Sequence, residues 1–272
     1  MLEYNRNGNT IKIKPSYTGL ATIFDKDILL YLASALVNAK NNGDAISKVV
    51  RFTTYDYIVS TNKALGGMQY KQMQEGLERL SGTRIQTNIK TGSVEITEEF
   101  GLIDSWKTVK EDATGKAIAV EVRLSDWFYN SIIGNAVLSI DRDYFRLRKP
   151  IERRLYELAR KHCGNQNIWK IGIENLKDKL GASTQLKLLR FNLKAIAETN
   201  HLPEYAMTLD NDVLTFSRRI PYKGQKPEQL PVHISANAVA KFVRDNPSLT
   251  RGKTEREVHE MIEKAKKRDN NR

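Results

Sequence analysis

The feature that most constrains the fold is an order of elements that occurs twice along the 272 residues. In each half, three segments with helical periodicity are followed by two strand-like segments that flank a short turn. A lone helix or hairpin cannot bury its apolar face, so each set is expected to fold around its own core. The sequence therefore predicts two modules of the same architecture.

The first half starts with alternating stretches in residues 1–22, which indicate one strand. Asp25 is expected to cap a helix that runs to about Ala39. Its apolar stripe consists of Ile28, Leu29, Leu32, Ala35, Leu36 and Ala39. Because Leu30, Tyr31 and Val37 make the other sides apolar too, the helix is either deeply buried or faces a partner.

A strand at Val49–Phe52 and a helix start at Thr53–Asp56 follow. The third helix is expected over residues 68–80, with a single buried face formed by Tyr70, Met73, Leu77 and Leu80. The next segments predict an enlarged β-region, with strands at 83–90, 93–96, 102–109 and 117–124. Ser125 and Asp126 can cap a short helix through Ile133.

The second half repeats this order more compactly. A helix over Leu147–His162 has Pro150 in its first turn, and a strand at Ile168–Ile171 and a short helix at 172–180 follow. Ser183 is expected to cap a third helix that runs to about Asn200. The segments 205–209 and 213–218 predict the closing hairpin.

Three helices followed by a hairpin are typical of the winged-helix module. The expected fold class is therefore α+β, with two tandem winged-helix modules and a basic C-terminal tail. We expect the first module in residues 1–142 and the second in residues 143–221. Residues 222–272 are expected to form a linker and a basic tail that is partly helical or disordered.

The positive charge, a formal net of +12, lies almost entirely in the second half of the chain. Residues 1–142 carry 17 Lys and Arg against 16 Asp and Glu. Residues 143–221 carry 15 against 9, and residues 222–272 carry 12 against 7. Such an excess favours an anionic polymer as partner, because each neutralised phosphate releases counterions. The charge indicates that the second half binds nucleic acid.

The third helix of the second module has the side chains that a reader of the major groove in double-stranded DNA needs. Arg and Lys can bind guanine or phosphate, Gln and Asn can pair with adenine, and the helix N-terminus favours phosphate. The candidates are Ser183, Thr184, Gln185, Lys187, Arg190, Asn192 and Lys194. Leu188 and Phe191 fall away from the core face and either contact thymine methyl groups or pack on a neighbouring helix.

Basic residues elsewhere in the second module are expected to contact the DNA backbone and set register. They are Lys149, Arg153 and Arg154 at its first helix and Arg218 and Arg219 at the end of its wing. The equivalent helix of the first module is nearly neutral and offers Gln69, Lys71, Gln72 and Arg79. This first module either contacts a second half-site or serves mainly as a surface for dimerisation.

One segment and one helix resemble a known family. Residues Asp143–Gly164 (DYFRLRKPIERRLYELARKHCG) resemble the hallmark stretch of bacterial plasmid replication initiators of the replication initiator A family. The segment Leu189–Lys194 (LRFNLK) resembles the recognition helix of that family. The resemblance covers about residues 15–220 and does not extend to the tail.

The resemblance implies two tandem winged helices that bind repeated sites, or iterons, at a plasmid origin. It further implies origin melting and recruitment of the host initiator and replicative helicase. It also implies a switch in which monomers initiate replication and dimers restrain copy number. The alternative is a repressor that binds an operator through the same modules and has no replication role.

Enzymatic classes lack their usual motifs, so we expect a protein that is not an enzyme and uses no cofactor. The four histidines form no His-x-His pair, and the single cysteine, Cys163, excludes a CxxC zinc site. Three Asp-x-Asp pairs, at residues 25–27, 141–143 and 210–212, are interpreted as a cap, a domain join and a turn. Gly252-Lys253-Thr254 lacks the earlier glycine of a P-loop. One cysteine and no long apolar run favour a cytoplasmic protein without a membrane span.

Overall fold

The computed structural model describes residues 1–6, 9–91, 94–110, 117–134, 137–164 and 166–219, together with Asn246, Leu249 and Met261. The chain divides into two compact units, and the boundary falls between residues 136 and 137. The segment before Asp143 lies in the second unit, where Ser139 O accepts a hydrogen bond from Arg160 Nε at 2.8 Å. The boundary therefore precedes the one expected at residue 142. Apart from its three described residues, the expected tail lies outside the described part of the chain.

The first unit is a mixed α/β structure with four helices and antiparallel sheets among its described residues. Its helices are α1 (Lys26–Asn41), α2 (Thr54–Ser60), α3 (Gly67–Gly82) and α4 (Asp126–Ile133). The strands β3 (Val49–Phe52), β6 (Ile103–Lys110) and β7 (Ala117–Leu124) form a sheet in the order β3-β7-β6. As expected, Ser125 caps α4, and its hydroxyl accepts a hydrogen bond from Phe128 N at 3.3 Å.

The second unit repeats this connectivity. It contains η1 (Arg142–Arg146), α5 (Pro150–Cys163), β8 (Ile168–Gly172), α6 (Ile173–Leu180), α7 (Leu186–Thr199), β9 (Tyr205–Asp210) and β10 (Val213–Arg218). Its sheet has the order β8-β10-β9, so the last strand of the hairpin pairs with the strand that follows the first long helix. The first unit has the same arrangement, because β7 lies between β3 and β6.

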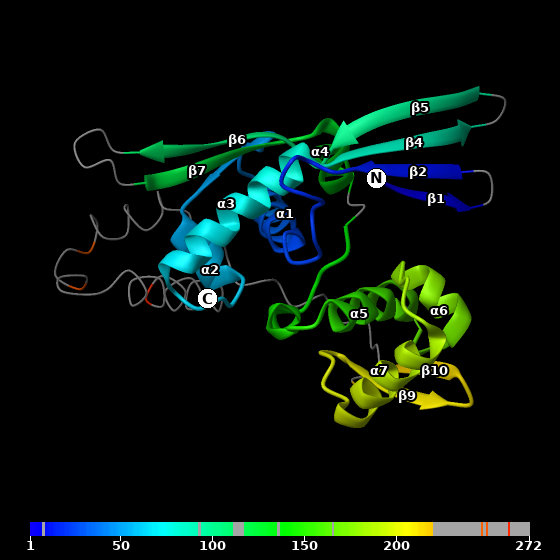
Figure 1. The fold of residues 1–272 in the computed structure, drawn as a ribbon. Helices are drawn as coiled ribbons and strands as arrows, with labels where there is room; N and C mark the ends of the chain where they lie inside the picture. Colours follow the sequence, from blue (N-terminus) through cyan, green and yellow to red (C-terminus); the bar gives the residue numbers. More distant parts are fainter. Residues whose placement is uncertain are drawn as a thin grey trace. The chain divides into compact units, whose positions relative to one another are not determined.

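A second sheet distinguishes the first unit from the second. It has four strands in the order β1-β2-β4-β5, namely β1 (Leu2–Arg6), β2 (Asn9–Lys14), β4 (Arg84–Thr91) and β5 (Val94–Gly101). Figure 1 shows these strands extending away from the β6–β7 hairpin. The expectation of one strand in residues 1–22 is therefore wrong, and β4 and β5 pair with this N-terminal hairpin rather than enlarging the wing. The missed strand pairs locally, because Arg6 of β1 lies opposite Asn9 of β2. Its union with β4 and β5 depends on the long-range pairing of β2 with β4, which local sequence patterns do not reveal.

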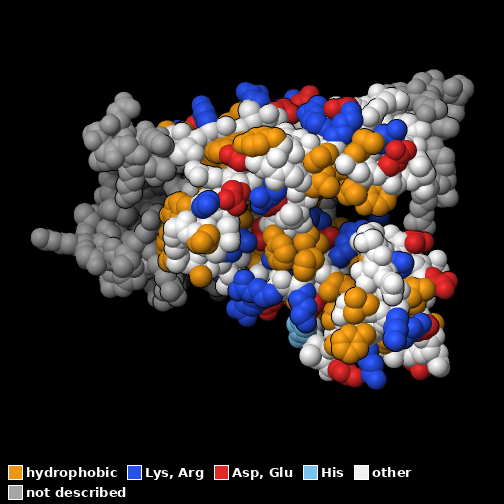
Figure 2. Space-filling view, viewed as in Figure 1, with side chains coloured by type: hydrophobic (Ala, Val, Ile, Leu, Met, Phe, Trp, Pro, Cys, Tyr) orange, Lys and Arg blue, Asp and Glu red, His pale blue; other side chains and the backbone are white. Residues whose placement is uncertain are grey.

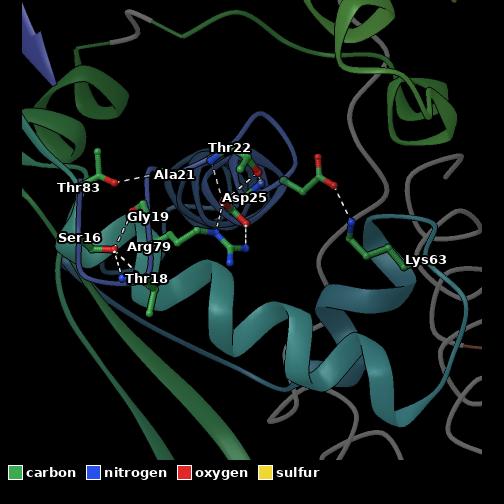
Figure 3. Close-up of polar contacts among 10 residues, drawn as sticks. Ser16, Thr18, Gly19, Ala21, Thr22, Asp25, Lys63, Arg79 and Thr83 are labelled. Atoms are coloured by element: carbon green, nitrogen blue, oxygen red, sulfur yellow. Dashed lines mark hydrogen bonds and ion pairs between the residues drawn. The ribbon is translucent and has the colours of Figure 1, made fainter. Parts of the chain in front are cut away.

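The N-terminus of α1 is held by an ion pair instead of a side-chain cap. Asp25 occupies the N-cap position of α1 but makes no capping hydrogen bond. Its carboxylate accepts two hydrogen bonds from Arg79 of α3, at 2.8 and 2.7 Å, and one from Thr22 N at 2.8 Å (Figure 3). Burial would raise the pKa of Asp25, but the hydrogen bonds from Arg79 and Thr22 outweigh it and the pKa is lowered.

The close approach of α1 to α3 requires a glycine at position 76. A Cβ atom added to Gly76 would lie 2.9 Å from Asp25 Oδ1 and 3.0 Å from Ile28 Cδ1. Met73, Leu77 and Leu80 are buried on this face, as expected. The fourth expected member, Tyr70, is 41% exposed because it lies in the first turn of α3, before the helix reaches the core.

Candidate nucleic-acid interface

Helix α7 packs on the second unit through one narrow apolar face. Leu189, Leu193 and Ile196 are each at most 2% exposed, and their spacing of four and three residues places them on one side of the helix. The helix begins at Leu186 with Gln185 as its N-cap residue, so the expectation that Ser183 caps it is wrong. Ser183 and Thr184 lie in the segment before the helix, because the chain after Gly181 does not become helical until Leu186.

The outward face of α7 combines apolar and basic side chains. Phe191 is 70% exposed and Leu188 is 53% exposed, while Lys187 and Lys194 are exposed beside them. Figure 2 shows hydrophobic and basic side chains next to one another on the surface that α7 occupies in Figure 1. Two roles were considered for Leu188 and Phe191. Their exposed fractions argue against packing on a neighbouring helix of the same unit.

Arg190 is joined to the turn of the hairpin. Its Nε and Nη2 atoms donate hydrogen bonds to the two carboxylate oxygens of Asp212, both at 2.7 Å. Asn211 and Asp212 form the two-residue turn between β9 and β10, and both have positive φ angles (45° and 61°), which Asn and Asp tolerate. The hydrogen bond lowers the pKa of Asp212 and raises that of Arg190. This bidentate pair therefore links α7 to the tip of the hairpin.

The supporting cations divide into available and structural ones. Lys149 is exposed at the N-cap of α5 and lies 3.5 Å from Glu152. Arg153 is only 2% exposed: its Nε donates to Leu147 O at 2.9 Å, and its guanidinium lies 5.0 Å from the centre of the Tyr144 ring. The expectation that Arg153 contacts DNA is therefore wrong, because its guanidinium is part of the core.

Three further arginines hold the backbone of their own unit. Arg154 donates two hydrogen bonds to Lys179 O, and Arg218 donates one to Gly164 O at 3.1 Å. Arg219 donates to carbonyl oxygens of Leu202 and Asn200. These contacts stabilise loops, and they leave Lys149, Lys187 and Lys194 as the more accessible cations among the candidates of the second unit.

In the first unit, the four DNA-binding candidates on α3 offer little positive charge to a partner. Lys71 and Gln72 are exposed and Gln69 is half-buried. Lys71 lies 3.8 Å from Glu75 one turn later. The guanidinium of Arg79 donates two hydrogen bonds to Asp25, so it is less available for a DNA contact than the sequence indicates. The structure thus gathers the candidates into two separate sets, one on each unit.

Each of the three Asp-x-Asp pairs contains a carboxylate with a structural partner. Asp27 binds Lys63 at 2.6 Å, and Asp141 caps η1 by accepting a hydrogen bond from Asp143 N at 2.7 Å. Asp212 binds Arg190. Within the described part of the chain, no group of three or more His, Cys, Asp or Glu residues could hold a metal ion. Among those same residues, no helix is long and apolar enough to cross a membrane.

Two features of this surface were not assigned by sequence reasoning. The partnership of Arg190 with Asp212 joins residues that are far apart in sequence, and only the positive charge of one and the turn position of the other were visible. The helical periodicity places Phe191 outside the apolar stripe of α7, which is consistent with its exposure. Periodicity alone does not predict that exposure, because a neighbouring element could have covered the Phe191 side chain.

Comparisons with known proteins agree on replication. The sequence model of the family described as "RPA: Replication initiator protein A" matches residues 1–207. A protein from Wigglesworthia glossinidia brevipalpis named "Putative replication protein" is 42% identical over 221 residues, which is 79% of this chain and 80% of that protein.

Solved structures support the fold. Two crystal structures of domains 2 and 3 of RctB match with TM-scores of 0.62 and 0.59 at 11% and 12% identity, each covering 80% of this chain and 90% of the other. At this identity the likeness concerns the fold alone. The match to the family over three quarters of the sequence, together with the 42% identical relative, shows that the chain belongs to the replication initiator protein A family.

Proposed function

We propose that this protein initiates plasmid replication by binding repeated origin sites in double-stranded DNA. The observation that carries the proposal is the outward face of α7, where Lys187 and Lys194 flank the exposed Phe191 in a unit with a net positive charge. A helix with this face suits the major groove, because its cations meet phosphates while its other side chains reach base edges. Family membership supports the replication role.

Each unit acts as a winged helix in this proposal. In the second unit, α5, α6 and α7 are the three helices and the β9–β10 hairpin is the wing. In the first unit, α1, α2 and α3 are the helices and the β6–β7 hairpin is the wing. The shared sheet order, β3-β7-β6 and β8-β10-β9, supports this tandem arrangement.

The first unit serves chiefly as a platform for self-association. Of the two roles considered for it, this one is favoured by the neutral surface of α3 and by the engagement of Arg79 with Asp25. The N-terminal sheet also exposes Leu2, Tyr4 and Ile11: Tyr4 lies opposite Ile11, and Leu2 lies two residues before Tyr4 on β1. On the basis of the family, we also propose that the protein recruits the host initiator and helicase. We further propose that this chain catalyses no reaction itself.

The second candidate function is an operator-binding regulator with the same modules. Both functions require specific binding to DNA, so binding alone does not separate them. The distinguishing experiment first tests the purified full chain in gel shifts against fragments that flank its own gene. The fragment that shifts is then placed on a plasmid that carries no other origin.

Replication that requires the full chain and the fragment together supports initiation. Replication of the plasmid without the chain, or specific binding with no replication, would leave the regulator as the better explanation. Metal-dependent nicking or primer synthesis that persists through purification would instead contradict the assignment of a non-enzymatic role.

A further inference from the structure

The outward face of α7 has an aromatic side chain at its centre. Phe191 is 70% exposed, and its neighbours one turn away in either direction are Lys187 and Lys194. Leu188 adds a second apolar group, 53% exposed, three residues before Phe191. The next residue on the same side, Ala195, is small and exposed, so a surface can approach the phenyl ring closely.

Arg190, the residue of α7 that is best suited to bind guanine, is bonded within the protein instead. Both Nε and Nη2 of Arg190 are bonded to the carboxylate of Asp212, which satisfies the fork that would otherwise bind a guanine. Asn192 is half-buried on the opposite flank of the helix. Around Phe191, the exposed groups of α7 that remain are the two lysines and the apolar side chains of Leu188 and Ala195.

We propose that Phe191, with Leu188, reads the 5-methyl groups of thymine in the major groove, and that Arg190 is a positioning residue that holds the hairpin turn against α7. This inference rests on the proposed DNA binding and names its specificity. Thymine is the base that presents an apolar group in the major groove, where it meets apolar side chains.

Charge decides between DNA and a protein as the occupant of this face. The exposed cations Lys187 and Lys194 border the apolar pair, and the one acidic residue of α7, Glu198, lies in its last turn. Lys187 and Lys194 lie on the same flank of the helix, four residues before and three residues after Phe191, and Leu188 lies on the other flank. Two cations on one flank can meet phosphates of one DNA strand while the apolar pair faces the groove. An apolar protein surface would leave both ammonium groups to be desolvated without a partner.

The test uses duplexes in which single thymines are replaced by deoxyuridine, which removes only the methyl group. A binding site is first selected from random duplexes with the full chain, and each thymine is then substituted in turn. Loss of one buried methyl group should weaken binding by the wild-type chain about fourfold at one or more positions. The Phe191→Ala variant should bind the thymine duplex more weakly and should no longer distinguish thymine from deoxyuridine at those positions.

Lys194→Ala is the matched control, because a lost phosphate contact should weaken binding to both duplexes equally. Thermal unfolding should be unchanged in both variants, since both side chains are exposed. Wild-type binding that is specific but indifferent to every substitution, or discrimination that survives in Phe191→Ala, would overturn the inference while leaving the proposed function intact.

Two other outcomes are diagnostic. If Phe191→Ala binds DNA as the wild type does but changes the sedimentation of the protein, the face is a protein contact and the inference is wrong. If selection enriches no sequence at all, the proposed function itself fails.

Discussion

Helices α3 and α7 occupy the same place in the two units but present different surfaces. Each is the helix that precedes the hairpin paired with the unit's early strand. Their buried residues have the same spacing, Met73, Leu77 and Leu80 in α3 and Leu189, Leu193 and Ile196 in α7.

Superposing these buried positions aligns the outward residues one by one. Lys71 then corresponds to Lys187, but Glu75 takes the place of Phe191 and Glu78 takes the place of Lys194. The core face thus fixes where the helix lies, and the outward residues determine what it can bind. The comparison supports the proposal that α7 recognises DNA and argues against an equal contribution from α3.

The largest expected effect tests whether the two helices have equivalent structural roles. Leu77 and Leu193 are both fully buried, so replacing either with alanine should destabilise its own unit by about 2–5 kcal/mol. Hydrogen exchange during urea titration, read separately for the two units, measures this loss. Leu188→Ala, at an exposed position, should change stability by less than about 0.5 kcal/mol. If Leu77→Ala lowered the free energy of unfolding of both units equally, the two units would not unfold independently.

The second prediction concerns the ion pair that α3 has and α7 lacks. Arg79→Ala should destabilise the first unit by about 2–3 kcal/mol, because it leaves the buried carboxylate of Asp25 without its charged donor. Since the folded-state pKa of Asp25 lies below 3.8, the pair's contribution is complete above that pH and disappears as the pH falls through the lowered value.

Urea unfolding at neutral pH and through the acidic range measures both effects. The variant should lose the part of the acid dependence that comes from Asp25. Unfolding curves that superimpose on those of the wild type at every pH would show that the pair contributes nothing.

The third prediction compares equivalent lysines on DNA. Lys187→Ala should weaken binding to all sequences and lower the slope of log affinity against log salt by about 1, as expected for one lost phosphate contact. Lys71→Ala should leave the slope unchanged. Binding titrations at several salt concentrations provide the measurement. If the slopes of log affinity against log salt were equal for the two variants, either both helices or neither would contact DNA.

The smallest effect is expected when α3 is made more like α7. Glu78→Lys introduces the charge that α7 has at Lys194. If the first unit serves self-association, affinity for DNA should change by less than about twofold, because the added charge meets no phosphate and is screened by salt. Fluorescence anisotropy with a random duplex measures this. A large, salt-sensitive gain would show that α3 lies against the DNA.

The sequence predicted most elements of both units within a few residues, because periodicity and turn residues are local signals. The hairpin of residues 205–218 is an example, since Asp210-Asn211-Asp212 interrupts two apolar stretches. The four-stranded sheet escaped prediction because β2 and β4 pair across more than sixty intervening residues. No local pattern carries that information.

The segment that most resembled the family contributes mainly to the core, although Lys149 within it is exposed. Tyr144, Leu155, Tyr156 and Ala159 within Asp143–Gly164 are all fully buried. Even its arginine at position 153 stacks on Tyr144 and donates to the backbone. A family signature of this kind reflects the fold, and in our proposal the residues that choose the DNA sequence lie on α7.

The sequence by itself determined the repeated order of elements, the face of α7 that packs on the core, and the location of the excess charge. These follow from hydrophobic periodicity and from residue type, which are local properties. The tertiary structure alone decided which cations remain available. Arg79, Arg153 and Arg190 read alike as basic residues, yet one is paired with Asp25, one is buried on Tyr144 and one is bonded to Asp212. A guanidinium's role depends on partners that the fold brings from distant positions, and those partners are invisible in the local sequence.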